Sequence, residues 1–134
     1  MRTEKEVLSY FKKWARKNDL IRAAVLTSSR ANPEAEVDFL SDYDIELYVS
    51  DLSWFKKSDE WLDEFGSIMV RWPFKPRSTG FKDGKWITRL VLFNDGLRID
   101  FQITDQLKIK EDAYDNGYQV LIDKDGITKE LEKP

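Results

Sequence analysis

Residues 42–49, DYDIELYV, alternate acidic or polar side chains with apolar ones, and this period of two constrains the fold more than any other stretch. Successive residues of a β-strand point to opposite faces of the sheet. The pattern therefore predicts a strand whose core-facing side chains are Tyr43, Ile45, Leu47 and Val49. Asp42, Asp44 and Glu46 would share the other face, with the aspartate Cα atoms roughly 6.6 Å apart at about 3.3 Å of rise per residue.

An apolar segment precedes this strand and ends in residues suited to phosphate. Residues 20–26 predict a central strand buried on both sides. Ser28, Ser29 and Arg30 follow it directly, and they offer two hydroxyls and a guanidinium. Two nearby carboxylates are the ligands that a hard divalent cation prefers. Together the two segments indicate metal-assisted chemistry on a nucleotide.

A third carboxylate lies further along the chain, in a predicted β-hairpin. The sequence Asn94-Asp95-Gly96 is a hairpin signal, so residues 86–93 and 97–104 should pair antiparallel. In the second strand Asp100 lies on the polar face. If this strand neighbours residues 42–49, three aspartates converge on one patch of sheet. Such a cluster is expected where a cation neutralises it or where it is well solvated, and one aspartate could act as a general base.

The remaining segments predict helices and further strands. Thr3 and Glu6 form a capping-box pattern at the start of an amphipathic helix over 3–17. The other expected elements are a helix over 57–65 with Trp61, Leu62 and Phe65 inward and Gly66 as its cap, a strand over 67–72, a helix over 105–114 and a strand over 118–122. These elements predict an α/β or α+β domain of two layers with a mixed sheet.

Composition narrows the chemistry. At 134 residues the chain is expected to form one domain. It contains no cysteine and no histidine, which excludes thiolate and imidazole ligands and points to Mg²⁺ or Mn²⁺. The net charge of -3 fits a nucleic-acid binder poorly. The sequence shows no apolar run long enough for a membrane span and no signal-like start, so a cytoplasmic protein that binds no membrane is expected.

Several motifs together resemble a known family. SSRAN, FLSDYDIELYVSD, WLDEFGSI, LFNDGLRIDFQI and VLIDKDG occur in this order between about residues 2 and 126. Their order resembles the nucleotidyltransferase superfamily related to DNA polymerase β. More closely, it resembles the N-terminal domain of bacterial aminoglycoside 6-adenylyltransferases, the streptomycin-resistance type. The resemblance implies a nucleotidyltransferase fold over 1–134.

The resemblance also implies an activity and roles for particular residues. Family members use magnesium to transfer AMP from ATP to a hydroxyl of an aminoglycoside. Ser29 would contact the triphosphate, with Ser28 and Arg30 beside it. Asp42 and Asp44 would bind Mg²⁺, and Asp100 would be the third carboxylate, either a metal ligand or the base.

Two departures from the family pattern keep a second function class open. The family usually has Gly-Ser where this chain has Ser28-Ser29, and glycine lets the backbone approach phosphates closely. Family members also carry a helical C-terminal domain that closes over the drug, and residues 1–134 do not include it. The alternative to an enzyme is a nucleotidyltransferase-like regulatory module that acts by protein contact, as antitoxin partners of this superfamily do.

Each candidate residue also has a plainer interpretation. Ser28 and Ser29 could satisfy backbone groups in a turn. Arg30 could form an ordinary salt bridge with Asp42 or Asp44. Lys124 is interpreted as a surface residue, with a phosphate contact as its alternative.

Overall fold

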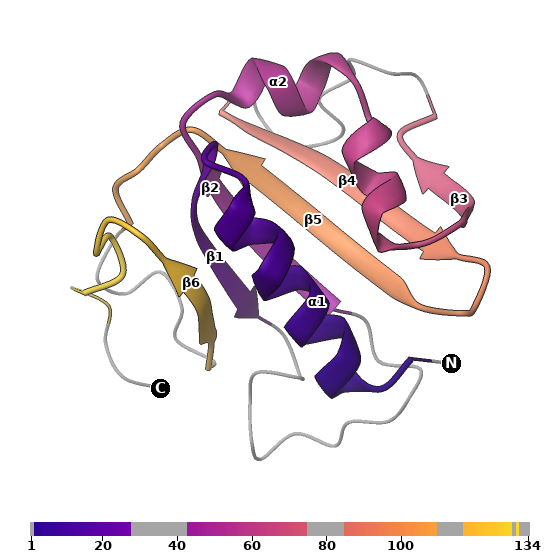
Figure 1. The fold of residues 1–134 in the computed structure, drawn as a ribbon. Helices are drawn as coiled ribbons and strands as arrows, with labels where there is room; N and C mark the ends of the chain where they lie inside the picture. Colours follow the sequence, from indigo (N-terminus) through magenta and orange to yellow (C-terminus); the bar gives the residue numbers. More distant parts are fainter. Residues whose placement is uncertain (1, 28–42, 75–84, 110–116, 130, 132–134) are drawn as a thin grey trace.

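A computed structural model describes residues 2–27, 43–74, 85–109, 117–129 and 131. Along the chain the elements are α1 (Glu4–Lys17), β1 (Ile21–Thr27), β2 (Tyr43–Val49), α2 (Leu52–Lys57), the 3₁₀ helix η1 (Glu60–Phe65), β3 (Ile68–Trp72), β4 (Trp86–Phe93), β5 (Arg98–Thr104) and β6 (Gln119–Asp123). Figure 1 shows the helices lying across a single mixed sheet. The predicted α+β class is confirmed. None of the described helices is long and apolar enough to cross a membrane.

The six strands follow the order β3-β4-β5-β2-β1-β6. β2 and β5 pair in parallel, and every other neighbouring pair is antiparallel. The predicted hairpin joins β4 to β5, and Gly96 adopts a φ of 90° in its turn, a conformation that glycine tolerates best. The strand that bears Asp44 and the strand that bears Asp100 are therefore direct neighbours.

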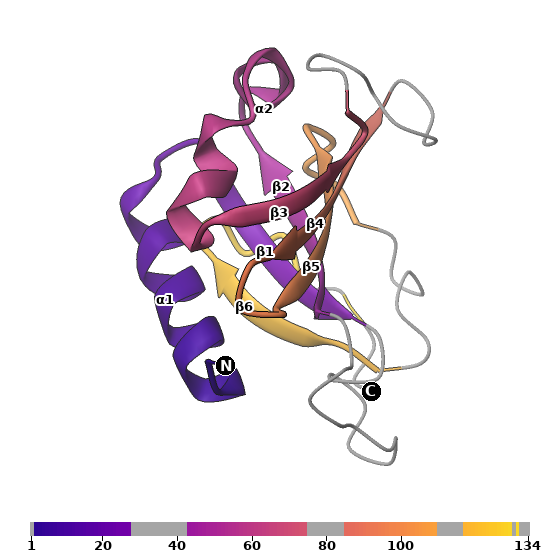
Figure 2. The same cartoon turned by 90° about the vertical axis from the view of Figure 1, so that its right-hand side faces the viewer.

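The main core lies between the sheet and its helices. Figure 2, with the sheet viewed from its side, shows α1 and α2 on the same face. The predicted inward side chains of β2 are all buried: Tyr43, Ile45, Leu47 and Val49. α1 contributes Val7, Phe11 and Ala15 to the same cluster. The alternation in the sequence thus correctly separates a helix-covered face from a second face, called here the open face, which carries Asp44 and Glu46.

α1 is capped at both ends. Thr3 Oγ1 accepts a hydrogen bond from the Glu6 backbone N–H at 3.2 Å, and the reciprocal bond completes the predicted capping box. At the other end Lys124 Nζ donates to the carbonyls of Ala15 and Asn18 at 2.9 and 2.8 Å. Burial, with repulsion from Arg22, lowers the Lys124 pKa. The interpretation of Lys124 as a surface residue was wrong, because its ammonium satisfies carbonyls at the end of the helix.

The helix predicted over 57–65 begins later and is a 3₁₀ helix, η1, and a separate helix, α2, precedes it. α2 ends at Lys57, Ser58 is extended, and η1 begins at Glu60. Trp61, Leu62 and Phe65 are buried as predicted, and Gly66 ends η1. The break places the Asp59 side chain inward, where it pairs with Arg89 of β4.

The helix predicted over 105–114 is wrong where it can be compared. Residues 105–109 have no helical structure, and residues 110–116 lie outside the described part. The Gln106 N–H bonds to Thr104 Oγ1 just after β5. Ile109 packs on the open face against a small apolar cluster that contains Val25 and Tyr48. Ile109 therefore buries apolar surface against the sheet although its segment is not helical.

Candidate active site

The pairing of β2 with β5 brings two of the predicted site residues together. Asp44 and Asp100 are Cα partners in the parallel register. Neighbouring strands lie about 4.8 Å apart, and paired residues project from the same face. The expectation that these strands are neighbours is confirmed. Asp42, Ser28, Ser29 and Arg30 lie outside the described residues.

A second polar row lies beside the aspartates. Glu46 and Gln102 are Cα partners, and Gln102 in turn pairs with Thr88 of β4. Thr88 Oγ1 donates to Gln102 Oε1 at 2.7 Å, and the Tyr48 hydroxyl donates to Glu46 Oε2 at 3.1 Å. Glu46 is thus held by a neighbour on its own strand. The aspartate pair lies two residues away from this row along the same two strands, roughly 6.6 Å at about 3.3 Å of rise per residue.

Arg98 is a site residue that the sequence analysis missed. Its Nε lies 3.3 Å from Asp100 Oδ1, and its side chain is 48% exposed whereas that of Asp100 is 16% exposed. The signal was available, because residues i and i+2 of a strand share a face. The guanidinium offsets part of the repulsion that arises when two carboxylates occupy adjacent strand positions.

The donor set fits a hard divalent cation. Asp44 and Asp100 supply carboxylate oxygens from facing positions, and Mg²⁺ binds through one or two carboxylates together with substrate phosphates. The residues that the structure describes contain no group of three acidic or other metal-binding side chains. The third predicted ligand, Asp42, precedes β2 by one residue and is not among them. The described part therefore contains two of the three expected carboxylates.

A shallow groove adjoins Asp100 on the side away from Asp44. Leu90 of β4 is the Cα partner of Asp100, and Trp72 of β3 is the partner of Leu90. The groove has a volume of about 270 Å³ and is lined by Val70, Trp72, Leu90, Val91, Leu92 and Arg98. Apart from the Arg98 side chain, this lining is apolar. It will be called the β3–β4 groove.

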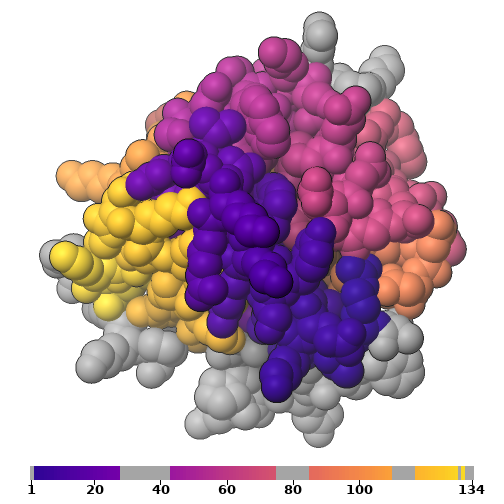
Figure 3. Space-filling view, in the orientation of Figure 1, coloured from indigo at the N-terminus to yellow at the C-terminus, as the bar shows by residue number. Residues whose placement is uncertain are grey.

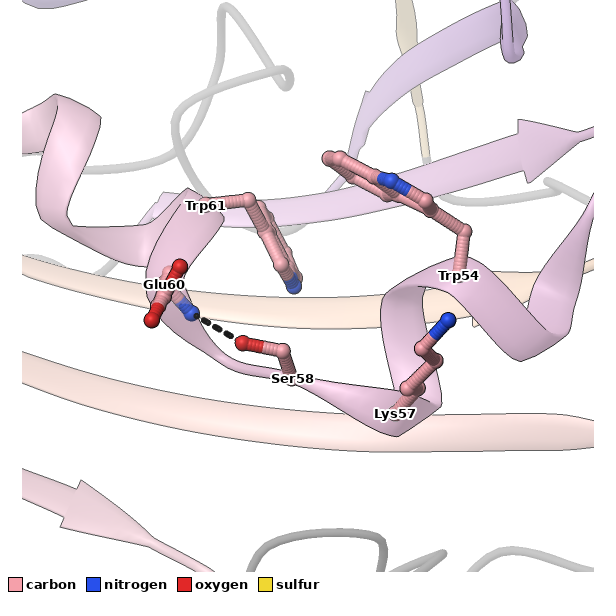
Figure 4. Close-up of a pocket in the computed structure, with 5 residues that line it drawn as sticks. All are labelled: Trp54, Lys57, Ser58, Glu60 and Trp61. Atoms are coloured by element: carbon pink, nitrogen blue, oxygen red, sulfur yellow. Dashed lines mark hydrogen bonds between the residues drawn. The ribbon is translucent and has the colours of Figure 1, made fainter.

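Another cavity lies in the helix layer, shown in Figure 4. It measures about 150 Å³ and is lined by Trp54, Lys57, Ser58, Glu60 and Trp61. Ser58 Oγ accepts from the Glu60 N–H at 3.2 Å. The Trp61 ring packs 5.0 Å from that of Phe101, which points to the face opposite Asp100. This cavity is thus separated from the aspartates by the sheet.

The mixed sheet with helices on one face is a nucleotidyltransferase fold, as comparison with a solved structure shows. The crystal structure of an aminoglycoside 6-adenyltransferase from Bacillus subtilis matches 78% of this chain, with a TM-score of 0.60 and 28% sequence identity, and the match covers 35% of that chain. A profile described as streptomycin adenylyltransferase matches residues 1–134. The chain belongs to the streptomycin adenylyltransferase family.

Curated relatives agree with this assignment. The chain is 34% identical to the aminoglycoside 6-adenylyltransferase of Bacillus subtilis (strain 168) over 129 residues, which are 93% of this chain and 45% of that protein. It is 32% identical to the Campylobacter jejuni protein of the same name, again over 93% of this chain, and that match covers 44% of the relative. The chain therefore spans about half the length of the curated relatives it matches.

Proposed function

We propose that this chain provides the nucleotidyltransferase domain of an enzyme that transfers AMP from ATP to a hydroxyl of an aminoglycoside. The observation that carries the proposal is the register of β2 and β5, which pairs Asp44 with Asp100 on the open face. Two carboxylates on adjacent strands repel each other, which costs folding free energy. A functional site accounts for the presence of such a pair. Family membership supplies the reaction class.

Each site residue has a proposed role. Asp42, Asp44 and Asp100 would hold Mg²⁺, or Mn²⁺, which would neutralise charge on the triphosphate. Ser28, Ser29 and Arg30, which follow β1 in the sequence, would bind the phosphates. In the reaction the acceptor oxygen bonds to the α-phosphorus, and the bond from that phosphorus to the pyrophosphate oxygen breaks. Asp100, which adjoins the β3–β4 groove, would accept the hydroxyl proton.

Metal-dependent ATP binding tests the site. Carboxylates repel a bare triphosphate, so calorimetry should detect ATP binding with Mg²⁺ or Mn²⁺ and none in EDTA. Glu46→Gln is the matched control, since it removes a carboxylate from the same face of the same strand and should leave binding unchanged. Equal ATP affinity with and without metal would contradict the proposed site.

The regulatory alternative predicts a different result in a turnover assay. Its supporting observation is Ser28 where the family usually has glycine. An enzyme should release pyrophosphate from ATP only when an acceptor such as streptomycin is present. Asp100→Asn should then lower the rate by about 10²–10⁴-fold, the usual contribution of a general base. The assay uses this domain joined to the C-terminal domain of a relative, because the chain spans about half the length of the relatives. Metal-dependent ATP binding without acceptor-dependent pyrophosphate release would then favour the regulatory module.

A further inference from the structure

The β3–β4 groove and the aspartates form one continuous row across the open face. From the inside of the sheet outward, successive Cα partners are Thr27, Asp44, Asp100, Leu90 and Trp72. Paired residues share a face, and each strand step is about 4.8 Å. The Trp72 backbone therefore lies roughly 10 Å from that of Asp100, two strand steps away. A ring compound seated between them could place a hydroxyl beside Asp100.

The in-line geometry of nucleotidyl transfer indicates which substrate would lie in the β3–β4 groove. In phosphoryl and nucleotidyl transfer the attacking and leaving oxygens are roughly in line through phosphorus. The proposed phosphate-binding residues follow Thr27, so the leaving pyrophosphate would lie toward β1. The attacking hydroxyl must then approach from the opposite side of the aspartates. That side is the β3–β4 groove.

A β-bulge turns the edge strand so that this groove can form. Ile68 pairs with Phe93 and Val70 pairs with Leu92, so Met69 is an extra residue in β3. Ile68 packs against the main core, whereas Val70 and Trp72 line the groove. Bulges commonly redirect side chains in this way beside functional sites. The bulge therefore moves β3 from a core-facing to a groove-facing register within two residues.

The lining suits the ring of a cationic, hydroxylated molecule. Leu90, Leu92 and Val70 offer an apolar surface to the C–H face of a sugar or cyclitol, and an indole such as Trp72 binds such a face or an attached cation. The open face also carries the carboxylates of Asp44, Glu46 and Asp100. Among the described residues that line the groove, Arg98 carries the positive charge, and it pairs with Asp100. An amine or guanidinium of the acceptor could replace the Arg98 guanidinium beside the Asp100 carboxylate.

We propose that the β3–β4 groove is the acceptor subsite, where the sugar or cyclitol ring that bears the reacting hydroxyl packs against Trp72, Leu90 and Leu92. This inference rests on the proposed function, and it assigns the acceptor ring to residues of this chain. Val70 and Arg98 border the subsite and set which rings fit.

Nuclear magnetic resonance of the indole N–H groups tests the subsite. Streptomycin is the probe, added to the chain saturated with Mg²⁺ and a non-hydrolysable ATP analogue, and Trp72→Phe identifies the Trp72 signal. Streptomycin should shift that signal. Val70→Lys, which places a cation on an already exposed position, should weaken streptomycin binding at least about fivefold. The affinity of the Val70→Lys variant for the ATP analogue should stay within about twofold of that of the unmodified chain, because the nucleotide would bind outside the groove.

Met69→Lys is the matched control, because Met69 is the neighbouring exposed residue and does not line the groove. It should leave streptomycin affinity unchanged. Equal effects of the two lysines, or no streptomycin-induced shift at Trp72, would overturn the subsite. A Trp72 shift caused by the ATP analogue, with loss of its affinity in Val70→Lys, would assign the groove to the adenine base and also overturn it. Failure of the unmodified chain to bind the analogue with Mg²⁺ would instead overturn the proposed function.

Discussion

Two aspartates on opposite faces of the sheet show how differently one fold can use a carboxylate. On the helix-covered face Asp59, whose side chain is 2% exposed, lies between Arg89 Nε at 2.7 Å and Arg71 Nη1 at 2.9 Å. On the open face Asp100 has a second aspartate, Asp44, as its cross-strand neighbour. One carboxylate is enclosed by two guanidinium groups, and the other lies beside a like charge and a single, largely exposed guanidinium, that of Arg98. Enclosure indicates a structural role, whereas the crowding of like charges is the feature on which the proposed metal site rests.

The buried ion cluster, formed by Asp59, Arg71 and Arg89, joins the helix layer to the sheet. Asp59 lies between α2 and η1, Arg71 belongs to β3, and Arg89 belongs to β4. Arg89 is fully buried, and its Nη1 also donates to the Thr88 carbonyl at 2.8 Å. The cluster thus fixes the link between the two helical pieces onto the edge strand β3 and its neighbour β4. Those same strands form the groove on the other face.

The largest expected effect comes from removing the buried carboxylate. Asp59→Ala would break the buried ion pair with Arg89, and breaking a buried pair costs about 3–5 kcal/mol of unfolding free energy. Urea denaturation followed by circular dichroism measures this. Asp63→Ala, an exposed position four residues later, should change stability by less than about 0.5 kcal/mol. A small effect at Asp59 would mean that the cluster does not fix the helix layer.

An intermediate effect is expected at the turn after β6. Asp123 accepts hydrogen bonds from the Ile127 N–H at 3.0 Å and the Thr128 N–H at 2.9 Å, and also from the Thr128 hydroxyl. Burial by itself raises its pKa, but these bonds outweigh burial and hold the pKa below its ordinary value. Asp123→Asn should therefore lose about 1–2 kcal/mol at pH 7.

The pH dependence checks this assignment. A lowered folded-state pKa stabilises the protein fully above the unfolded pKa of about 3.9, and the contribution is lost as pH falls through the lower folded value. The difference between Asp123→Asn and the unmodified chain should therefore shrink below about pH 4. A constant difference from pH 7 to pH 2 would show that the charge of Asp123 contributes nothing.

The smallest effect on stability, with the largest on binding, is expected at Asp44. Asp44→Asn relieves repulsion with Asp100 and should leave the melting temperature in EDTA unchanged or raised. Metal-dependent ATP binding should be lost. A clear fall in melting temperature would instead assign Asp44 to a structural ion pair, whose rupture costs on the order of 3–5 kcal/mol when partly buried.

Local patterns in the sequence predicted much of this fold. The alternation in β2, the hairpin at Asn94–Gly96 and the capping box at Thr3 each depend on residues close in sequence. The sequence could not predict that β2 pairs with β5, so the convergence of their aspartates was only a conditional expectation. The two strands are separated by about 50 residues, and their pairing depends on how those residues fold. The structure shows that Asp44 and Asp100 are neighbours. The roles proposed for them, for Asp42 and for residues 28–30 stay predictions.

The buried ion cluster escaped the sequence analysis for the same reason. Asp59, Arg71 and Arg89 come from three separate segments, and each resembles an ordinary charged surface residue. A signal does exist in β4, where Ile87, Val91 and Phe93 are core residues and Arg89 occupies an inward position of the same series. A charge at an inward position requires a buried partner. The identity of that partner is set by tertiary packing alone.

The contacts of Lys124 tie early and late parts of the chain together. β6 pairs with β1, and Arg22 forms an ion pair with Asp125 at 2.7 Å beside the Lys124 bonds to α1. Figure 3 shows α1 and the β6 segment side by side on the surface. During synthesis, α1 and β1 therefore leave the ribosome about a hundred residues before the strand that completes their edge. Long-range pairing of this kind is slow to form, and we expect β1 to remain an exposed strand edge, open to other chains, until residue 124 has emerged.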